Sequence, residues 1–174
     1  ADGWNYFSRQ LYEWFSVPDV QIDSKSGIHT YGNMIWIFFM TQYFETDIMR
    51  KYLETFSSGT QGDYGEFTQL FNQYGTNLAD TFKTFTVWNY FTGDRDDGRH
   101  YFNGHRIPTV FIEPTDIHQT YPTNVFIDRY TIPKHFSSRY IQFNPPVGEV
   151  IDQFAIKVDA LDLAPADLSV MTES

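Results

Sequence analysis

A histidine and a tyrosine lie two residues apart in the segment His29-Thr30-Tyr31-Gly32, directly before a long apolar run. Either side chain could donate a hydrogen bond to an oxyanion that develops during acyl transfer. The same segment also suits a helix entry, with Gly32 allowing a close backbone approach and Tyr31 packed in the core. His29 and Tyr31 are therefore the candidate catalytic residues, and their spacing leaves both interpretations open.

Carboxylates recur in the segment Gly93-Asp94-Arg95-Asp96-Asp97-Gly98-Arg99, as they do in the first half of a calcium-binding loop. Such a loop closes with a bidentate Glu at its twelfth position, and the twelfth position counted from Asp94 is His105. The two arginines of the segment could instead neutralise the acids locally. We expect Asp94, Asp96 and Asp97 either to bind calcium or to form an exposed, self-paired loop.

The remaining motifs predict no complete metal site or catalytic site. His100 and His105 could bind a metal, but two histidines at this spacing need further ligands. The sequence has no His-Glu-x-x-His zinc pair, no Gly-x-Ser-x-Gly elbow, no phosphate loop and no dinucleotide fingerprint. It also has no cysteine, which excludes thiol catalysis, disulfides and cysteine metal sites. Taken alone, the chain carries no complete catalytic constellation.

The composition is that of an acidic, aromatic-rich globular chain of 174 residues. Twelve Lys and Arg against 22 Asp and Glu give a net charge of −10. This balance disfavours nucleic acids and anionic membranes, because phosphate neutralisation requires clustered cations. The longest apolar run, 34–40, is seven residues long, whereas a membrane span needs about 20. A start at Ala1 without an initiator Met leads us to expect a processed piece of a secreted or cell-surface protein.

Apolar residues recur at spacings of three and four through the first two thirds of the chain, which predicts amphipathic helices. The expected helices span 1–15, 34–44, 48–56, 64–74 and 78–91, with a strand as the rival interpretation for 34–44. Six of the eight prolines lie between residues 108 and 146, where short β-prone runs occupy 109–112, 124–127, 139–143 and, further on, 150–158. We therefore predict an α+β chain with a helical lobe at 1–115 and a β-rich tail at 116–174.

Four segments stand out for their order and spacing: Trp14-Phe15-Ser16-Val17-Pro18, His29-Thr30-Tyr31-Gly32, Phe85-Thr86-Val87-Trp88-Asn89-Tyr90-Phe91-Thr92-Gly93 and Asp96-Asp97-Gly98-Arg99-His100-Tyr101-Phe102. Together they resemble the C-terminal half of the catalytic region in a family of secreted, gluzincin-type zinc metallopeptidases. The resemblance covers roughly residues 4–115, and 88–93 is its most specific part. It implies that the chain then continues into a β-sandwich module, whose start would lie at 133–158.

The resemblance implies that zinc is held by a His-Glu-x-x-His helix and a downstream Glu, both of which would precede Ala1. It also implies a tyrosine that stabilises the tetrahedral intermediate, three residues before a glycine. Counted back from Gly32, that position is His29, and Tyr31 is the other candidate. We therefore expect a fragment of a zinc metallopeptidase-like protein that does not hydrolyse peptides alone. Its partners would be the missing upstream polypeptide and a peptide substrate.

The alternative is a non-catalytic structural or binding piece of an extracellular or cell-surface assembly. Aromatic richness suits packed interfaces, and orphan strands suit pairing with a neighbouring chain, including a second copy of this one. A module that binds sugars on aromatic platforms is less favoured, because Trp4, Trp14, Trp36 and Trp88 all fall at positions expected inside helix cores.

Overall fold

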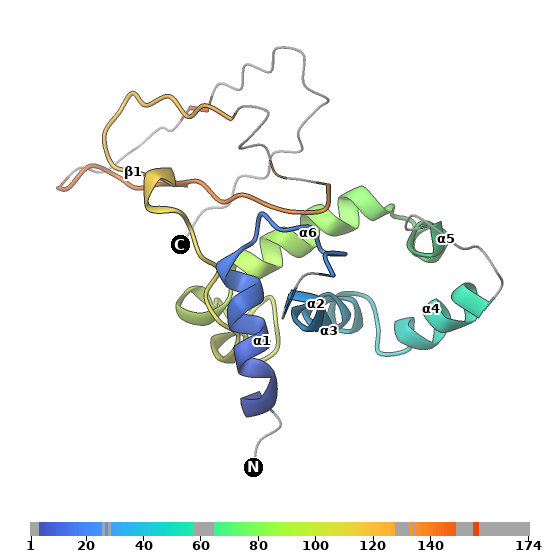
Figure 1. The fold of residues 1–174 in the computed structure, drawn as a ribbon. Coiled ribbons are helices and arrows are strands. Elements are labelled where there is room, and N and C mark those ends of the chain that lie inside the picture. The colour runs from blue at the N-terminus through green and yellow to red at the C-terminus, as the bar shows by residue number, and fades with distance from the viewer. Residues whose placement is uncertain are drawn as a thin grey trace.

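The computed structural model describes residues 4–25, 27, 29–57, 65–127, 133, 135–148 and 155–156. In these residues the chain is mostly helical, with a small two-stranded sheet, and is thus a loosely α+β structure (Figure 1). The helices are α1 (Trp4–Ser16), α2 (His29–Gly32), α3 (Met34–Tyr43), α4 (Ile48–Ser57), α5 (Gly65–Gln73) and α6 (Leu78–Tyr90). Short 3-10 turns follow at Gly93–Arg95, Gly104–Arg106 and Pro114–Asp116, and the strands are β1 (Ile117–His118) and β2 (Gln142–Phe143).

The helices expected from the apolar spacing are confirmed to within a few residues. Helix α6 begins where Asn77 caps it, since the Asn77 side chain accepts a hydrogen bond from the backbone N–H of Asp80 at 2.9 Å. The segment with the rival strand interpretation is helix α3, which buries Ile35, Trp36, Phe39 and Met40 and leaves Ile37 and Tyr43 exposed. Among the described residues, no helix is both long and apolar enough to cross a membrane.

The core is built from aromatic rings that several helices share. Trp36 on α3 contacts Phe85 on α6 at a centroid distance of 4.9 Å and Phe71 on α5 at 6.0 Å. Phe85 also contacts Trp14 on α1 at 5.7 Å, in an edge-to-face arrangement. Aromatic pairs of this geometry contribute about 0.5–1.5 kcal/mol each beyond the burial of their area. The rings therefore join α1, α3, α5 and α6 around one centre.

The strands predicted at 109–112 and 124–127 are wrong, because both segments are irregular in the structure. Residues 109–112 do alternate between buried and exposed, with Val110 and Ile112 inside and Phe111 outside. Their backbone groups are satisfied by other elements, however. The N–H of Phe111 donates to Phe15 O at 2.9 Å, and Arg95 donates to Val110 O at 3.1 Å. The segment is therefore an extended loop between helices and lies in no sheet.

The sheet is much smaller than the sequence predicted. Strand β1 pairs in parallel with β2, with Ile117 opposite Gln142 and His118 opposite Phe143. Only the last two residues of the predicted strand at 139–143 are in β2. The prediction for 150–158 lies outside the described residues except at 155–156, which form no strand. A β-sandwich beginning at residue 133 stays a prediction.

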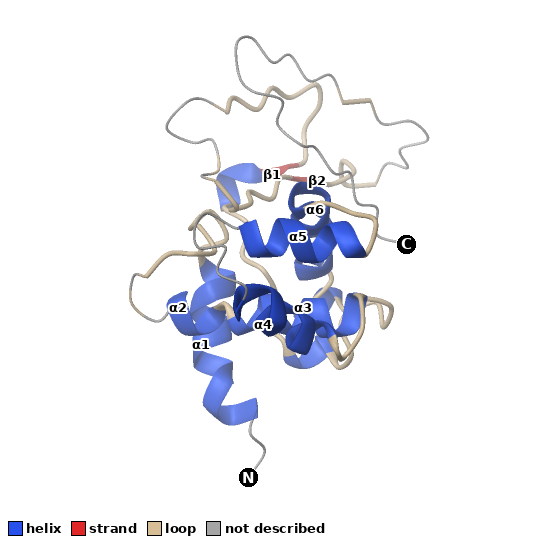
Figure 2. Cartoon of the chain, turned by 90° about the vertical axis from the view of Figure 1, so that its right-hand side faces the viewer, coloured by secondary structure: helices blue, strands red, loops and turns tan. Residues whose placement is uncertain are grey.

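The described part of the tail packs against the helices (Figures 1 and 2). The N–H of Ile22 donates to Phe136 O at 3.0 Å, and the hydroxyl of Tyr140 donates to Thr86 O on α6 at 2.8 Å. Arg139 holds Asp116 through a bidentate ion pair, with atoms 2.6 and 2.7 Å apart, in which the carboxylate is almost fully buried. The first two contacts cross the boundary predicted between residues 115 and 116, whereas the ion pair lies within the predicted tail. The division into domains stays a prediction.

The buried phenols of Tyr101 and Tyr140 predict that the fold loses stability in alkaline solution. Burial raises the pKa of both hydroxyls above the ordinary tyrosine value. The unfolded chain loses these protons near pH ~10 while the folded chain keeps them, so stability is complete below that pH and falls above it. In urea titrations at a series of alkaline pH values, Tyr140→Phe should show a weaker pH dependence than the wild type. Tyr12→Phe is the control, because the Tyr12 side chain is exposed. The prediction is contradicted if the free energy of unfolding of Tyr140→Phe depends on pH as steeply as that of the wild type.

Candidate functional site

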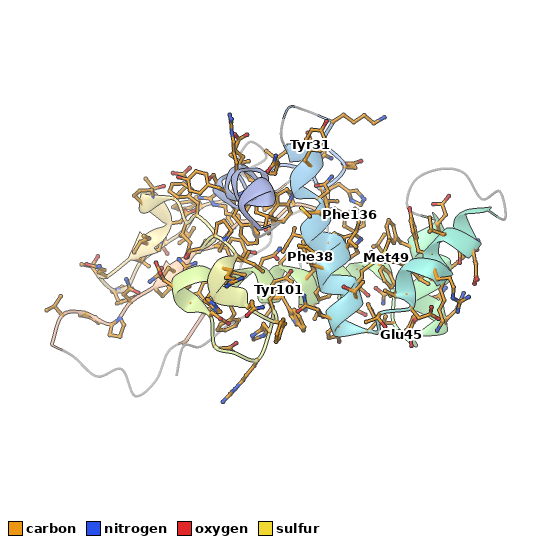
Figure 3. The ribbon with its side chains drawn as sticks, turned by 90° about the horizontal axis from the view of Figure 1, so that it is seen from below. Tyr31, Phe38, Glu45, Met49, Tyr101 and Phe136 are labelled. Carbon is orange, nitrogen blue, oxygen red and sulfur yellow. The ribbon has the colours of Figure 1, made fainter. Side chains whose placement is uncertain are left out.

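The phenol of Tyr31 is presented to solvent from the short helix α2, at the outer edge of the molecule (Figure 3). Its side chain is 69% exposed, so the interpretation that packed Tyr31 in the core does not apply. The backbone of His29 begins the same helix, and its side chain lies outside the described residues. Of the two candidate donors, Tyr31 is the one whose surroundings the structure describes.

Helix α2 is held against α1 by a glycine contact. A Cβ atom placed on Gly32 would lie 2.4 Å from the Cβ of Trp14, a distance that no real side chain tolerates. The indole Nε1 of Trp14 donates to Asn33 Oδ1 at 3.1 Å, just beyond the end of α2. Trp14 is itself buried and packs on Phe85. Tyr31 therefore projects from a backbone whose position is set by the core.

The aspartates of the loop after α6 differ in their hydrogen bonds. Asp96 Oδ1 accepts from the N–H of Gly98 at 3.0 Å, and Asp96 Oδ2 accepts from the N–H of His105 at 2.7 Å. Asp94 is exposed, and its backbone N–H donates to the Thr109 hydroxyl at 2.9 Å. Asp96 thus closes the loop by accepting hydrogen bonds from the backbone of Gly98 and of His105.

Asp97 is paired with His100. Its Oδ1 lies 2.9 Å from Nδ1 of His100 and 3.0 Å from the N–H of Arg99. Burial opposes ionisation of Asp97, but the hydrogen bonds from His100 and Arg99 outweigh it and lower the pKa of the carboxyl group. From the sequence, Asp97 was assigned to the acidic loop and His100 to a histidine pair. Their spacing of three residues was the signal that could have predicted the contact between them.

Arg95 contacts groups outside the acidic loop, and its expected neutralisation of the acids stays a prediction. Its guanidinium lies 4.7 Å from the ring centroid of Tyr90, and it donates to Val110 O. No group of three or more His, Asp or Glu within the described residues is arranged to hold a metal ion. Calcium binding by Asp94, Asp96 and Asp97 stays a prediction, and metal binding by His100 and His105 stays one too.

Three residues of the segment 88–93, Asn89, Thr92 and Gly93, hold the polypeptide that follows α6. The hydroxyl of Tyr101 donates to the buried Asn89 Oδ1 at 2.7 Å, and the Thr92 hydroxyl lies 2.9 Å from Pro108 O. Gly93 has a φ of 58°, and a Cβ there would lie 2.1 Å from the Thr109 hydroxyl. These contacts dock the polypeptide after α6 onto the end of that helix. The most specific part of the family resemblance therefore forms scaffold.

An open hollow lies along α6 at some distance in sequence from Tyr31. It is lined by Asp80, Lys83, Thr84, Val87, Trp88 and His100. Tyr31 is not among these residues, so this hollow is separate from the candidate donor. Lys83 was not among the candidate site residues predicted from the sequence. Trp88 was expected in a helix core, although its side chain is only half-buried.

Comparison of the chain with family models, with curated proteins and with solved structures found no match. The resemblance to gluzincin-type peptidases therefore rests on the four quoted segments alone.

We predict that Gly32→Ala destabilises the chain by about 1–3 kcal/mol, because the new methyl group overlaps Trp14 and must displace α2 or α1. Gly65→Ala is the matched control, since a Cβ at Gly65 meets no atom within 4 Å. Urea unfolding at neutral pH measures both free energies. Equal stability of the two variants would show that α2 is not held by this contact.

Asp96→Ala should destabilise the chain by about 1–3 kcal/mol, because it leaves two backbone N–H groups without their carboxylate acceptor. Asp94→Ala should change stability by less than about 0.5 kcal/mol, because its side chain is exposed. Thermal unfolding of both variants tests the difference. The same melts repeated with added calcium test the calcium prediction, since a bound ion would raise the Tm of the wild type.

Proposed function

We propose that this chain is the downstream helical lobe of a longer, secreted zinc metallopeptidase-like protein. The proposal is supported by the four segments that resemble gluzincin-type peptidases. The described residues themselves do not fit a zinc site. Under this proposal the zinc ligands lie in polypeptide that precedes Ala1, and the chain alone does not hydrolyse peptides.

The exposed phenol on a fixed backbone is the observation that carries this proposal. A donor that stabilises a developing oxyanion must be available to the substrate and must already be in position, because reorganisation during the reaction would reduce its effect. Tyr31 has an exposed side chain, and the Trp14–Gly32 contact sets the backbone from which it projects. These are the properties that the role requires.

In the proposed mechanism, the hydroxyl of Tyr31 donates a hydrogen bond to the oxyanion of the tetrahedral intermediate. The helices behind it form one wall of the substrate cleft and exclude water from that side. His29 belongs to the same four-residue helix, and it is the alternative donor if the substrate lies nearer the beginning of α2. Peptide substrate and upstream polypeptide are then the partners of this face.

A specific observation also favours the second candidate, a non-catalytic binding piece of an extracellular assembly. Several large apolar side chains are strongly exposed, among them Phe102 at 78% and Phe126 at 85%. Exposed aromatic residues are enriched where proteins meet partners. Under this alternative the chain associates with a neighbouring protein or with a second copy of itself, and the exposed Tyr31 is one more contact residue.

The test uses the whole natural protein, including the polypeptide encoded before Ala1. We expect it to bind zinc and to cleave peptides, and we expect Tyr31→Phe to lower kcat by roughly 100-fold with little change in KM, as for loss of one oxyanion donor. The control is Tyr12→Phe, which removes an equally exposed hydroxyl from α1.

The outcomes separate the candidates. Full activity in Tyr31→Phe together with lost activity in His29→Ala would make His29 the donor. A protein with no zinc-binding motif before Ala1, and no zinc-dependent cleavage, would overturn the peptidase proposal and leave the binding piece.

A further inference from the structure

The hollow along α6 has a volume of about 360 Å³, a size suited to a small organic ligand. Five of its six lining residues come from α6, at the spacings of three and four that place them on one side of a helix. The sixth, His100, comes from the loop that folds back beside the helix. The hollow thus lies between helix α6 and a loop that is held closed by hydrogen bonds within the loop.

The apolar part of the hollow is Trp88 with Val87. The Trp88 ring is fixed by edge-to-face contacts with Phe39 at 5.3 Å and with Tyr101 at 5.1 Å. Tyr101 is buried and bonded to Asn89, so these neighbours are themselves held in place. The half-buried indole therefore offers a ligand a rigid apolar surface at low entropic cost.

The charged groups of the hollow are not equivalent. Asp80 already accepts a hydrogen bond from the Asn77 side chain at 2.6 Å. Lys83 forms no ion pair within the described part of the chain, although the protein carries a net charge of −10. An ammonium group left unpaired in so acidic a protein is the stronger attraction for a ligand of opposite charge.

His100 adds a second polar group whose orientation is fixed. Its ring is stacked on Phe91 at a centroid distance of 4.4 Å and lies edge-on to Trp88 at 5.6 Å. Nδ1 carries the proton in the contact with Asp97, because a carboxylate only accepts. Nε2, on the other side of the ring, is the nitrogen left for a ligand.

We propose that this hollow binds a small organic carboxylate with an apolar body. The carboxylate bonds to the Lys83 ammonium in the hollow that His100 borders, and the body lies on Trp88 and Val87. The proposal does not depend on the peptidase proposal, since it uses none of the residues of α2. A sugar or an organic amine would also contact an aromatic surface, and both are outcomes of the test.

The test titrates the full chain with glucose and with three probes that share a phenylpropyl body: 3-phenylpropionate, 3-phenylpropanol and 3-phenylpropylamine. Binding is followed by the indole N–H signals in NMR, with the Trp88 signal assigned from Trp88→Phe. We expect saturable binding of the carboxylate that shifts the Trp88 signal, and affinity for the alcohol and the amine at least about tenfold weaker.

Two variants separate the charge from the apolar body. Lys83→Met keeps the length of the side chain and should weaken carboxylate binding by about tenfold, while Lys83→Arg should retain most of it. Lys25→Met removes an exposed lysine outside the hollow and should have no effect. Equal binding of alcohol and carboxylate, stronger binding of the amine or of glucose, or no saturable shift at Trp88 would each overturn the proposal.

Discussion

The ring of Phe85 is the contact on which the packing of the helices depends. It lies on α6 without solvent exposure and contacts Trp14 of α1, Trp36 and Phe39 of α3 at centroid distances of 5.7, 4.9 and 5.3 Å. Because one ring meets two other helices, the position of α1 cannot change without disturbing α3. The contact between Trp14 and Gly32 then transmits this position to α2. The placement of Tyr31, five residues from the nearest of these rings in sequence, is thus a consequence of core packing.

Helix α6 carries a second set of contacts on its other sides, and these explain its mixed composition. Extended polypeptide has backbone groups that must be satisfied, and a buried group without a partner costs about 1–3 kcal/mol. The Thr92 hydroxyl lies 2.9 Å from Pro108 O. The Thr86 carbonyl accepts a hydrogen bond from the Tyr140 hydroxyl. Asn89 does the same for the buried Tyr101. Small polar residues therefore alternate with rings along α6, because one helix both fills the core and anchors the loops.

The helices could be predicted from the sequence because a helix that buries one face repeats its apolar residues every three or four positions. The strand at 109–112 could not be judged in the same way. The alternation of side chains along an extended segment indicates which of them share its buried side, and it was right about Val110 and Phe111. It does not indicate which groups the backbone of the segment binds, here Phe15 O. The role of Asp96 was also beyond the sequence, since it accepts a hydrogen bond from the N–H of His105, nine residues away in a separate 3-10 turn. The exposure of Tyr31 was left open because the contact that places helix α2 joins Gly32 to Trp14, far away in the sequence.

An aromatic core of this kind also bears on how the chain can carry chemistry. Rings hold few rotamers, so a backbone packed on them has little freedom, and a polar side chain that projects from it pays a smaller entropic cost when it binds a ligand. Tyr31 projects from a backbone packed on Trp14, and His100 is stacked on Phe91 and lies edge-on to Trp88. Removing the polar end of either side chain leaves the rings beneath in place. Under the peptidase proposal, activity and stability can therefore be separated by substitution at Tyr31, whereas at Asn89 or Thr92 the polar atoms hold the fold together.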